Sequence, residues 1–318
     1  MKPNIFFVCP RFYFYHTLLA DKLREKGYDV DSFEERYYGI KYLFLRFLGN
    51  KLFSFFSKRR YIRYLNCNPK RYDWVLVVRG ESFPVEILSL LRQRNPNLKA
   101  ILYEWDSLRN FDYSDIMLAF DKVYSFDKKD CLNMHLNYLP LFYSEDSVLV
   151  RNSQVEKSID ILMISTYLPE RIKYIRFFNI FAQKNHLTFS YYLYVTRYRY
   201  FILKFFRGNP LKGIECHFSP LSRKKLFNFY SQSKTIIDIC NVAQSGLSMR
   251  VIEMIGAGKK IITTNKLIAE CIIIPKEQYQ IIDMVQKIDL DFIINNSSAS
   301  LNVHEELFID NWLEILLS

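Results

Sequence analysis

"QSGLSMRVIEMIGAGKKIITTN", residues 244–265, is the stretch of sequence that decides the fold, because it joins a helix to a strand in one pattern. Apolar side chains recur in it at the spacing of a single helix face. They are Leu247, Val251, Met254 and Ile255. Gly258 suits the end of that helix, and "KIITT" directly after it is typical of a buried strand. The stretch therefore predicts one helix-to-strand step of an α/β fold.

The first half of the chain repeats this alternation of apolar runs and helical patterns. The apolar runs lie at 4–9, 28–33, 73–78, 100–105, 122–126 and 136–142. Among the helical patterns between them, 17–27 ends on a glycine and 84–96 starts with a proline. Strands separated by helices predict a parallel sheet with helices on both faces.

A polar interval at 143–158 lacks periodicity and is interpreted as a linker. Because the alternation starts again after it, we expect an α/β protein of two Rossmann-like domains that face each other across a cleft. Their predicted bounds are 1–150 and 151–300. The end of the chain, 301–318, holds an amphipathic helix with no strand after it, and we expect this helix to pack back on the first domain.

The composition narrows the class of protein. Half of the 318 residues are hydrophobic and 24% are charged, which excludes a disordered chain. The formal charge of +11 favours an anionic partner. Six scattered cysteines without a C-x-x-C pair, and five histidines without an H-E-x-x-H motif, predict reduced thiols and no metal site. With no apolar run long enough to span a bilayer, we expect a cytoplasmic protein.

The start of the helix in the opening stretch carries polar residues that suit a phosphate group. Ser245 or Ser248 can cap the helix, and Gly246 lets the backbone come close to a ligand. Unpaired amides and the positive end of the helix dipole lie at the same place. Arg250 and Glu253 share the side opposite the apolar face. Two interpretations remain open: an ordinary capped helix with a solvated Arg and Glu, or a phosphate and ribose site.

A resemblance favours the second interpretation. The opening stretch resembles the donor-nucleotide segment of GT-B glycosyltransferases, in particular a bacterial lipopolysaccharide and capsule biosynthesis group related to CgeB-like proteins. That group carries Q-S-G-L-T-M-R-x-x-E followed by G-x-G-K-K-I-I-T-T-N. A second block is similar in order and spacing: "YEWDSLRNF" (103–111), "FDKVYSFDKKDC" (120–131) and "LPLFY" (139–143). The resemblance implies a GT-B fold and a metal-independent enzyme that uses a nucleotide-sugar and no further cofactor.

The resemblance also implies a set of donor-binding residues at the start of this helix. They are Ser245, Gly246, Leu247, Ser248, Met249, Arg250 and Glu253. Glu253 matches the glutamate that binds the ribose. Many retaining GT-B enzymes carry a second glutamate eight residues earlier, near the donor sugar, and here that position is Ser245. The sequence therefore leaves open whether the reaction retains or inverts the sugar's configuration.

A second donor loop is "ISTYLPER", residues 164–171. In GT-B enzymes the corresponding loop faces the donor diphosphate. Arg171, in the first turn of the next predicted helix, could therefore make a charge-assisted contact to that group, with Thr166 as a further candidate. The alternative is a solvated arginine near the start of a helix.

Two carboxylates are candidates for the general base that deprotonates an acceptor hydroxyl. Asp106 follows the predicted strand "AILYEW", and Glu81 lies in "VVRGES" after another strand. The alternative role of Asp106 is to cap the next turn. Asp127, in "SFDKKD", is expected to be a helix N-cap.

A basic and aromatic segment, 36–64, contains eight Lys or Arg residues and no acid. Such a segment favours a helix that lies in the headgroup region of an anionic membrane. Residues 191–208 have similar chemistry. The alternative is that both segments belong to the core, with Lys and Arg reaching out to solvent.

Taken with the resemblance, these features predict a glycosyltransferase that acts at the inner face of the cytoplasmic membrane. Its expected partners are a nucleotide-sugar donor, a growing and lipid-linked bacterial surface glycan as the acceptor, and the anionic membrane at 36–64. Nucleic acid is not expected, because no binding motif accompanies the charge. The alternatives are a non-catalytic GT-B protein that organises polysaccharide or coat assembly, and an epimerase on the same scaffold.

Overall fold

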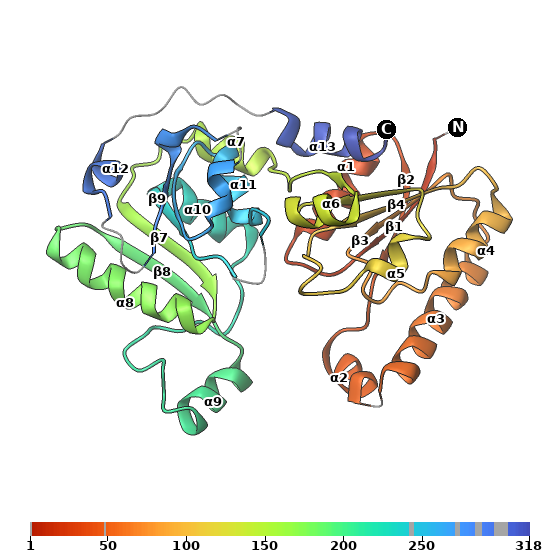
Figure 1. Cartoon of the computed structure of the whole chain (residues 1–318), viewed down its shortest axis with the longest axis horizontal. Helices are drawn as coiled ribbons and strands as arrows, with labels where there is room; N and C mark the ends of the chain where they lie inside the picture. The colour runs from red at the N-terminus through yellow and green to blue at the C-terminus, as the bar shows by residue number, and fades with distance from the viewer. Residues whose placement is uncertain (1, 48, 242–244, 271–273, 284–287, 296–304) are drawn as a thin grey trace. The chain divides into compact units, whose positions relative to one another are not determined.

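The computed structural model describes residues 2–47, 49–241, 245–270, 274–283, 288–295 and 305–318, which divide into two compact units (Figure 1). The first unit holds the described residues of 1–140 together with 245–246 and 310–318. The second unit holds those of 141–241 and 247–309. The main change of unit comes after Pro140, earlier in the chain than the expected bound at 150.

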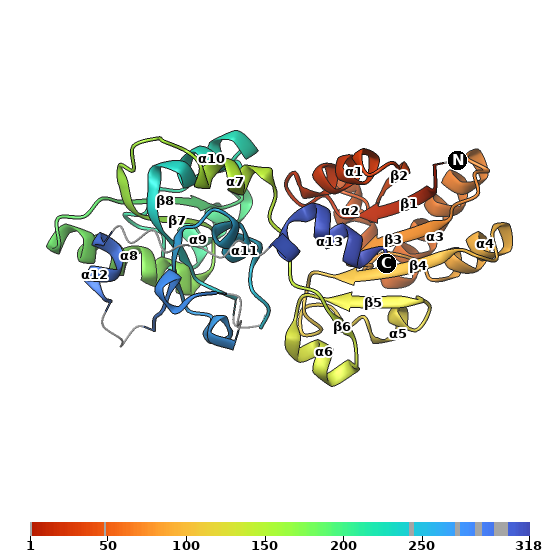
Figure 2. The ribbon, with the colours of Figure 1, turned by 90° about the horizontal axis from the view of Figure 1, so that it is seen from above.

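Six parallel strands form the sheet in the described part of the first unit. They are β1 (Asn4–Cys9), β2 (Asp29–Glu34), β3 (Trp74–Val78), β4 (Lys99–Glu104), β5 (Lys122–Ser125) and β6 (Asn137–Tyr138). They lie side by side in the order β2-β1-β3-β4-β5-β6, which Figure 2 shows. The helices between them are α1 (Tyr15–Glu25), α2 (Gly39–Phe47), α3 (Asn50–Cys67), α4 (Glu86–Arg94), α5 (Ser114–Met117) and α6 (Lys128–Met134).

Helices cover both faces of this sheet, because successive side chains of a strand point to opposite faces. On one face, Phe6, Val75 and Leu102 belong to a core that is closed by α3 and α4. On the other face, Tyr103 packs edge to face on Trp312, with ring centroids 4.8 Å apart. The expected parallel sheet between two helical layers is confirmed.

The described part of the second unit contains a parallel sheet in the order β11-β10-β9-β7-β8. Its strands are β7 (Ile159–Thr166), β8 (Phe189–Tyr194), β9 (Ser233–Asp238), β10 (Lys260–Thr263) and β11 (Tyr279–Ile281). Its α-helices are α7 (Glu145–Arg151), α8 (Pro169–Lys184), α9 (Arg197–Phe206), α10 (Arg223–Gln232), α11 (Met249–Gly256) and α12 (Leu290–Ile294). Short 3-10 turns are η1 (Lys266–Glu270), η2 (Lys276–Gln278) and η3 (Glu305–Leu307).

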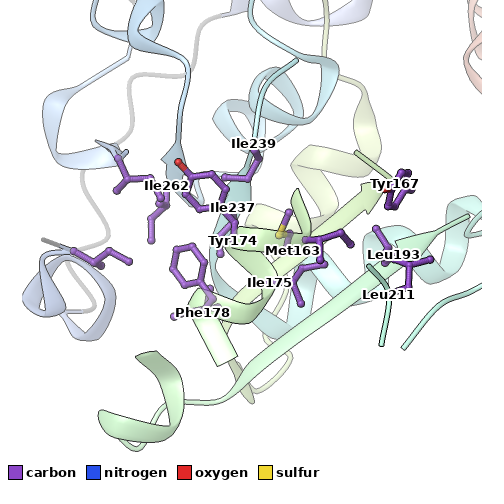
Figure 3. Close-up of a cluster of buried hydrophobic side chains, with 14 of the residues drawn as sticks. Met163, Tyr167, Tyr174, Ile175, Phe178, Leu193, Leu211, Ile237, Ile239 and Ile262 are labelled. Carbon is purple, nitrogen blue, oxygen red and sulfur yellow. The ribbon is translucent and has the colours of Figure 1, made fainter. Parts of the chain in front are cut away.

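The main core of the second unit lies between α8 and the sheet, as Figure 3 shows. Ile175 and Phe178 of α8 are fully buried against side chains from three neighbouring strands. Those partners are Met163, Ile237 and Ile262. Helices α10 and α11 contact the sheet as well, so a helix-to-strand step of the predicted kind, α11 followed by β10, is part of this unit.

The C-terminal helix α13 (Ile309–Leu316) packs on the first unit, as the sequence predicts. The indole Nε1 of Trp312 donates a hydrogen bond to the Pro140 carbonyl at 2.8 Å. Glu314 pairs with Lys26 at 2.7 Å. Buried Leu313 and Leu316 complete the apolar face of the helix.

The interpretation of 143–158 as an unstructured linker is wrong in part, because helix α7 lies within it. Acidic Glu145 and Asp146 in its first turn and Arg151 in its last turn suit the helix dipole. Val150 is buried, and Asp146 forms an ion pair with Arg223 of α10. The sequence did not predict this helix, because most of its side chains are polar and show no apolar period.

The segment 36–64 forms two helices rather than one, because the chain turns at Gly49, where φ is +97°. The core interpretation holds for part of this segment, and the membrane interpretation stays a prediction. Tyr61 of α3 is fully buried, whereas Phe47 of α2 is 88% exposed. Within the described residues, no helix combines the length and the apolar character that crossing a membrane requires.

Candidate active site

Each sheet has a point where the chain reverses the direction in which strands are added. In the first unit β2 and β3 lie on opposite sides of β1, and in the second unit β8 and β9 lie on opposite sides of β7. The loops at the carboxyl ends of such strands diverge, and open α/β sheets bind ligands there. Most of the site residues predicted from the sequence lie in the loops of these two edges.

Arg171 spans the reversal point of the second sheet. Its Nη1 donates to the carbonyl and the hydroxyl of Thr166, at the end of β7, at 3.0 and 2.9 Å. Its Nε donates to the carbonyl of Ile239, directly after β9, at 3.1 Å. The guanidinium is therefore fixed to the carboxyl ends of two strands, and a positive charge stands where a ligand of the second unit would bind.

Asp238, the last residue of β9, holds the start of α11 in place. Its Oδ1 accepts hydrogen bonds from Arg250 Nη1 at 2.8 Å and from the Ser248 hydroxyl at 3.0 Å. Ser248 is also the N-cap of α11, because its Oγ accepts from the backbone N–H of Val251. The other carboxylate oxygen of Asp238 is buried and has no hydrogen-bond partner in the part of the chain that the structure describes. One buried acid thus orients a serine and an arginine at this helix end.

Glu253 lies in the interior of α11 and is only 3% exposed. The Tyr230 hydroxyl donates to its Oε2 at 3.4 Å. Burial, together with the nearby Glu253 carboxylate, raises the pKa of Tyr230 well above its ordinary value, so the phenol stays a donor. Leu247 is buried beside the helix start, and Met249 is its half-buried first residue. The side of α11 that carries Glu253 is therefore an interior side in this structure.

Ser245 and Gly246 belong to the first unit, where they contact Asp127. The Asp127 Oδ2 accepts from the backbone N–H of Ser245 at 3.0 Å and of Gly246 at 3.3 Å. Asp127 also caps α6 through two of its first amides, which confirms the expected N-cap. A Cβ at Gly246 would lie 2.4 Å from the Phe126 ring, so the close approach that requires glycine here is to Phe126.

The turn after β3 gives the first unit a strained arginine. Arg79 and Gly80 both have left-handed backbones, with φ of +73° and +70°. A Cβ at Gly80 would come within 2.8 Å of Ile116 Cδ1, so any residue other than glycine would force the Ile116 side chain to move. For Arg79 the conformation costs about 1–2 kcal/mol. Its backbone N–H donates to the carbonyl of Tyr103 at 2.9 Å, which anchors the turn to β4.

Arg79 joins the two candidate bases. Its Nη2 lies 2.7 Å from Glu81 Oε2, and its Nε lies 2.8 Å from Asp106 Oδ2. Arg36 adds a second contact to Glu81, at 3.2 Å. Both carboxylates remain partly exposed. The structure therefore brings Glu81 and Asp106 to one guanidinium, and Arg36 also contacts Glu81.

Two further carboxyl groups are fully buried at this edge. Glu35 follows β2, and its Oε1 accepts from the backbone N–H of Ser82 at 2.9 Å. Burial raises the pKa of Glu35 to about 7, against the opposing effect of Arg79. Burial, with Glu35 and Asp106 adding to it, raises the pKa of Glu104 well above its ordinary value. Among the described residues, no set of three or more His, Cys, Asp or Glu side chains is arranged to hold a metal ion.

Three residues of these edges escaped the sequence analysis: Arg79, Asp238 and Glu35. Each follows or ends a strand that was predicted, in "VVRG", "TIIDIC" and "SFEE". A polar residue at the carboxyl end of a buried strand is the signal that could have found them. Their partners include residues of other loops and of the start of α11, which the periodicity of one segment does not reveal.

Comparison with known proteins supports the fold. An α-glucosyltransferase, solved with UDP and a 13-mer DNA, has a TM-score of 0.55 at 13% identity, over 83% of this chain and 81% of its own. A starch synthase IV catalytic domain from Arabidopsis thaliana, bound to ADP and acarbose, has a TM-score of 0.53 at 11% identity, over 99% and 94%. The chain has the GT-B fold.

The same fold occurs in proteins of another activity. A protein from Listeria monocytogenes assigned as a UDP-N-acetylglucosamine 2-epimerase has a TM-score of 0.53 at 11% identity, over 94% of this chain and 90% of its own. No protein-family model and no curated protein matches the sequence. The fold therefore agrees with the expectation from the motif, whereas the reaction has to be argued from the residues.

Proposed function

We propose that this protein is a GT-B glycosyltransferase, which transfers a sugar from a nucleotide-sugar to a hydroxyl of a growing, lipid-linked bacterial surface glycan. One observation carries the proposal: at the reversal point of the second sheet Asp238 holds Ser248 and Arg250, and Arg171 is bonded to the carbonyl of the next residue along the chain, Ile239. The segment that supplies two of these residues is also the one that resembles the donor-nucleotide segment of GT-B glycosyltransferases.

In this proposal the second unit binds the donor. The diphosphate would lie at the start of α11, where backbone N–H groups, Arg250 and Arg171 offer donors and positive charge. Asp238 would keep Arg250 in the orientation that this contact needs. Glu253 would accept hydrogen bonds from ribose hydroxyls, and its burial makes it a strong acceptor once its partner Tyr230 yields to the ligand.

The first unit would supply the base. The acceptor hydroxyl attacks the anomeric carbon, its proton passes to a carboxylate, and the bond from the sugar to the diphosphate breaks. Asp106, which follows β4, is the first candidate for the base and Glu81 is the second, because Arg79 contacts both carboxylates and both remain partly exposed. The negative charge that develops on the leaving nucleoside diphosphate is met by the fixed donors and arginines of the second unit, a contribution that needs no metal ion.

The proposed acceptor is carried on a membrane, and α2 and α3 suit contact with one. Leu43, Phe44 and Phe47 of α2 are exposed, as are Leu52 and Phe55 of α3. The segment around them contains eight Lys or Arg residues and no acid. Exposed aromatic side chains among basic ones suit the headgroup region of an anionic bilayer. We place the enzyme at the cytoplasmic face of the membrane on these grounds.

The test is incubation of the purified protein with UDP-, GDP-, dTDP- and CMP-sugars, followed by analysis of both products. With no glycan acceptor present, water accepts the sugar, so the proposal expects slow release of free nucleotide and free sugar from at least one donor, loss of this release in Glu253→Ala, and wild-type release in the exposed control Glu215→Gln. Return of an epimerised nucleotide-sugar would favour an epimerase. Failure of every donor to bind would contradict the proposal and favour a non-catalytic role.

A further inference from the structure

Helix α9 exposes an aromatic stripe. Tyr198 is 77% exposed and Phe205 is 61% exposed, and Phe201 lies between them with more than half of its surface in solvent. Their spacing of i, i+3 and i+7 places the three rings on one side of the helix. On the opposite side Leu203 is buried in the core of the second unit. The helix is therefore apolar both toward its own core and toward the outside.

Basic side chains border this stripe. Arg197, Arg199, Lys204 and Arg207 are all exposed. At 100° per residue, Arg197 and Lys204 fall on one flank of the rings, whereas Arg199 lies nearer the buried side, with its guanidinium 4.8 Å from the centroid of the Tyr167 ring. The Lys204 ammonium lies 5.5 Å from the Phe205 ring centroid. No Asp or Glu occurs from 171 to 214, a range with nine Lys or Arg residues, so the partner of this face should be anionic.

We propose that α9 is a second membrane-docking helix, which lies in the headgroup region of an anionic lipid surface with its three rings at the acyl boundary. An aromatic stripe bordered by cations matches the layering of such a surface, in which anionic headgroups border an apolar interior. A nucleic-acid duplex would satisfy the cations but would leave the three rings in water, because its bases are stacked on one another. The proposal does not depend on glycosyl transfer, and it concerns a different unit from α2 and α3.

The test is co-sedimentation with phosphatidylcholine vesicles that contain or lack phosphatidylglycerol. Wild-type protein is expected to sediment with the anionic vesicles and to stay in the supernatant when the vesicles are neutral. The double variant Phe201→Ser, Phe205→Ser should lower the binding about tenfold. The control Leu118→Ser removes an exposed leucine of the first unit and should have no effect.

Three results would overturn the proposal: wild-type vesicle binding by the double variant, equal binding to neutral vesicles, or stronger binding to a DNA duplex than to anionic vesicles. Repeating the measurement with the double variant Phe44→Ser, Phe47→Ser separates the contribution of α9 to vesicle binding from that of α2. Nucleotide release, measured on the same protein without vesicles, reports on the proposed enzyme independently of any of these results.

A different observation concerns the first unit. Glu35 and Arg36, which follow β2, hold the turn that carries Glu81 from two sides. The Glu35 carboxylate accepts the Ser82 N–H at 2.9 Å, and Arg36 pairs with Glu81 at 3.2 Å. The second oxygen of Glu35 is buried and has no hydrogen-bond partner among the described residues. Because Arg79 in the same turn also holds Asp106, a change at Glu35 reaches both candidate bases.

We infer that Glu35 is a positioning residue for the candidate bases, because it holds the Ser82 N–H of the turn whose Arg79 contacts both Glu81 and Asp106. An ionised Glu35 adds a negative charge behind this turn, and a like charge nearby makes a carboxylate more basic. The groups that face Glu35 include charged and titratable side chains from every neighbouring element. They are Cys9, Arg36, Tyr38, Tyr61, Arg79, Glu81 and Glu104.

This second inference rests on the proposed function, and its test is the pH profile of kcat for nucleotide release. Wild-type kcat should rise as the pH passes about 7, the value to which burial raises the pKa of Glu35. Glu35→Gln keeps an acceptor for Ser82 but does not ionise, so this step should disappear with KM unchanged. The neighbouring control Glu34→Gln should keep the step.

An infrared measurement makes the inference testable without turnover. A carboxyl band that ionises near neutral pH in wild-type protein should be missing from Glu35→Gln. A wild-type pH step in the kcat of Glu35→Gln, or persistence of the band in that variant, would overturn the inference. If no donor is turned over, the proposed function fails, and the infrared band still decides whether Glu35 ionises.

Discussion

The two sheets share a doubly wound topology, but their carboxyl edges carry different chemistry. At the second edge, Arg171 and Arg250 are fixed by carbonyls and by one buried carboxylate, Asp238. At the first edge, a strained arginine stands among four carboxyl groups, two of which are fully buried. The second arrangement suits an anionic ligand held by preset donors, whereas the first suits a proton transfer. In the proposed function, the second edge binds the donor and the first edge supplies the base.

The largest expected effect separates chemistry from binding. Replacing Asp106 with Asn removes the proposed proton acceptor, so kcat for transfer should fall about 10²- to 10⁴-fold while nucleotide affinity stays unchanged. Steady-state kinetics and calorimetric titration on the same protein measure both quantities. Asp115→Asn, an exposed acid on α5, serves as the matched control. Wild-type kcat in both Asp106→Asn and Glu81→Gln would remove the first edge from the mechanism.

The next effect concerns stability at the first edge. The pKa of Glu35 is raised in the folded chain from an ordinary 4.5 to about 7. Between these values the unfolded chain ionises Glu35 while the folded chain still binds the proton. The contribution of Glu35 to stability should therefore be greatest at low pH, fall as the pH rises to about 7, and change no further above it, by about 3 kcal/mol in total.

Glu35→Gln should remove this loss, so that the stability of the variant relative to wild-type protein increases as the pH rises. Urea unfolding at a series of pH values measures the difference, with Glu34→Gln as the control. A wild-type slope in Glu35→Gln would show that the buried carboxyl does not govern the pH dependence of the first unit.

A smaller effect is expected at the second edge. Arg250→Met removes a cation from the proposed diphosphate site and should weaken nucleotide-sugar binding about 10- to 100-fold. Arg223→Met, which breaks the ion pair to Asp146 in the same unit, should leave affinity unchanged. A lower kcat of Arg250→Met with an unchanged Kd of the donor would contradict the proposal that the second edge binds the donor.

The smallest effect compares two glycines with left-handed backbones. Gly80 lies in the turn of the first edge, where a Cβ would meet Ile116 at 2.8 Å, whereas Gly213 has no atom within 4 Å of that position. Alanine at either site costs about 1–2 kcal/mol for the backbone alone. Gly80→Ala should cost about 1 kcal/mol more, because Ile116 has to move. Equal midpoints of urea unfolding for the two variants would contradict this.

The sequence predicted the fold well because periodicity records burial. The strand at 73–78 and the helix at 84–96 are found within a few residues of their predicted places, as β3 and α4. The polar helix α7 was missed because its contacts are ion pairs and small buried side chains, which leave no apolar period. The break of 36–64 at Gly49 was missed because both halves carry the same composition.

The candidate site was predictable only in its local parts. Ser248 as an N-cap and Asp127 as an N-cap follow from side chains that bond their own helix. Asp238, Arg79 and Glu35 matter through partners in other loops or at the start of α11, so the periodicity of one segment does not identify them. The burial of Glu253 was also unexpected, because helical spacing fixes the side of a residue but not what packs against that side.

The most direct test of the central claim is the Kd of a nucleotide-sugar for three proteins, measured by calorimetric titration against UDP-, GDP-, dTDP- and CMP-sugars. The account predicts that wild-type protein and Asp106→Asn bind the same donor with equal affinity, and that Glu253→Ala binds it at least tenfold more weakly. Equal affinity in all three proteins, or no binding of any donor by the wild type, would contradict the claim that the second edge is the nucleotide-sugar site.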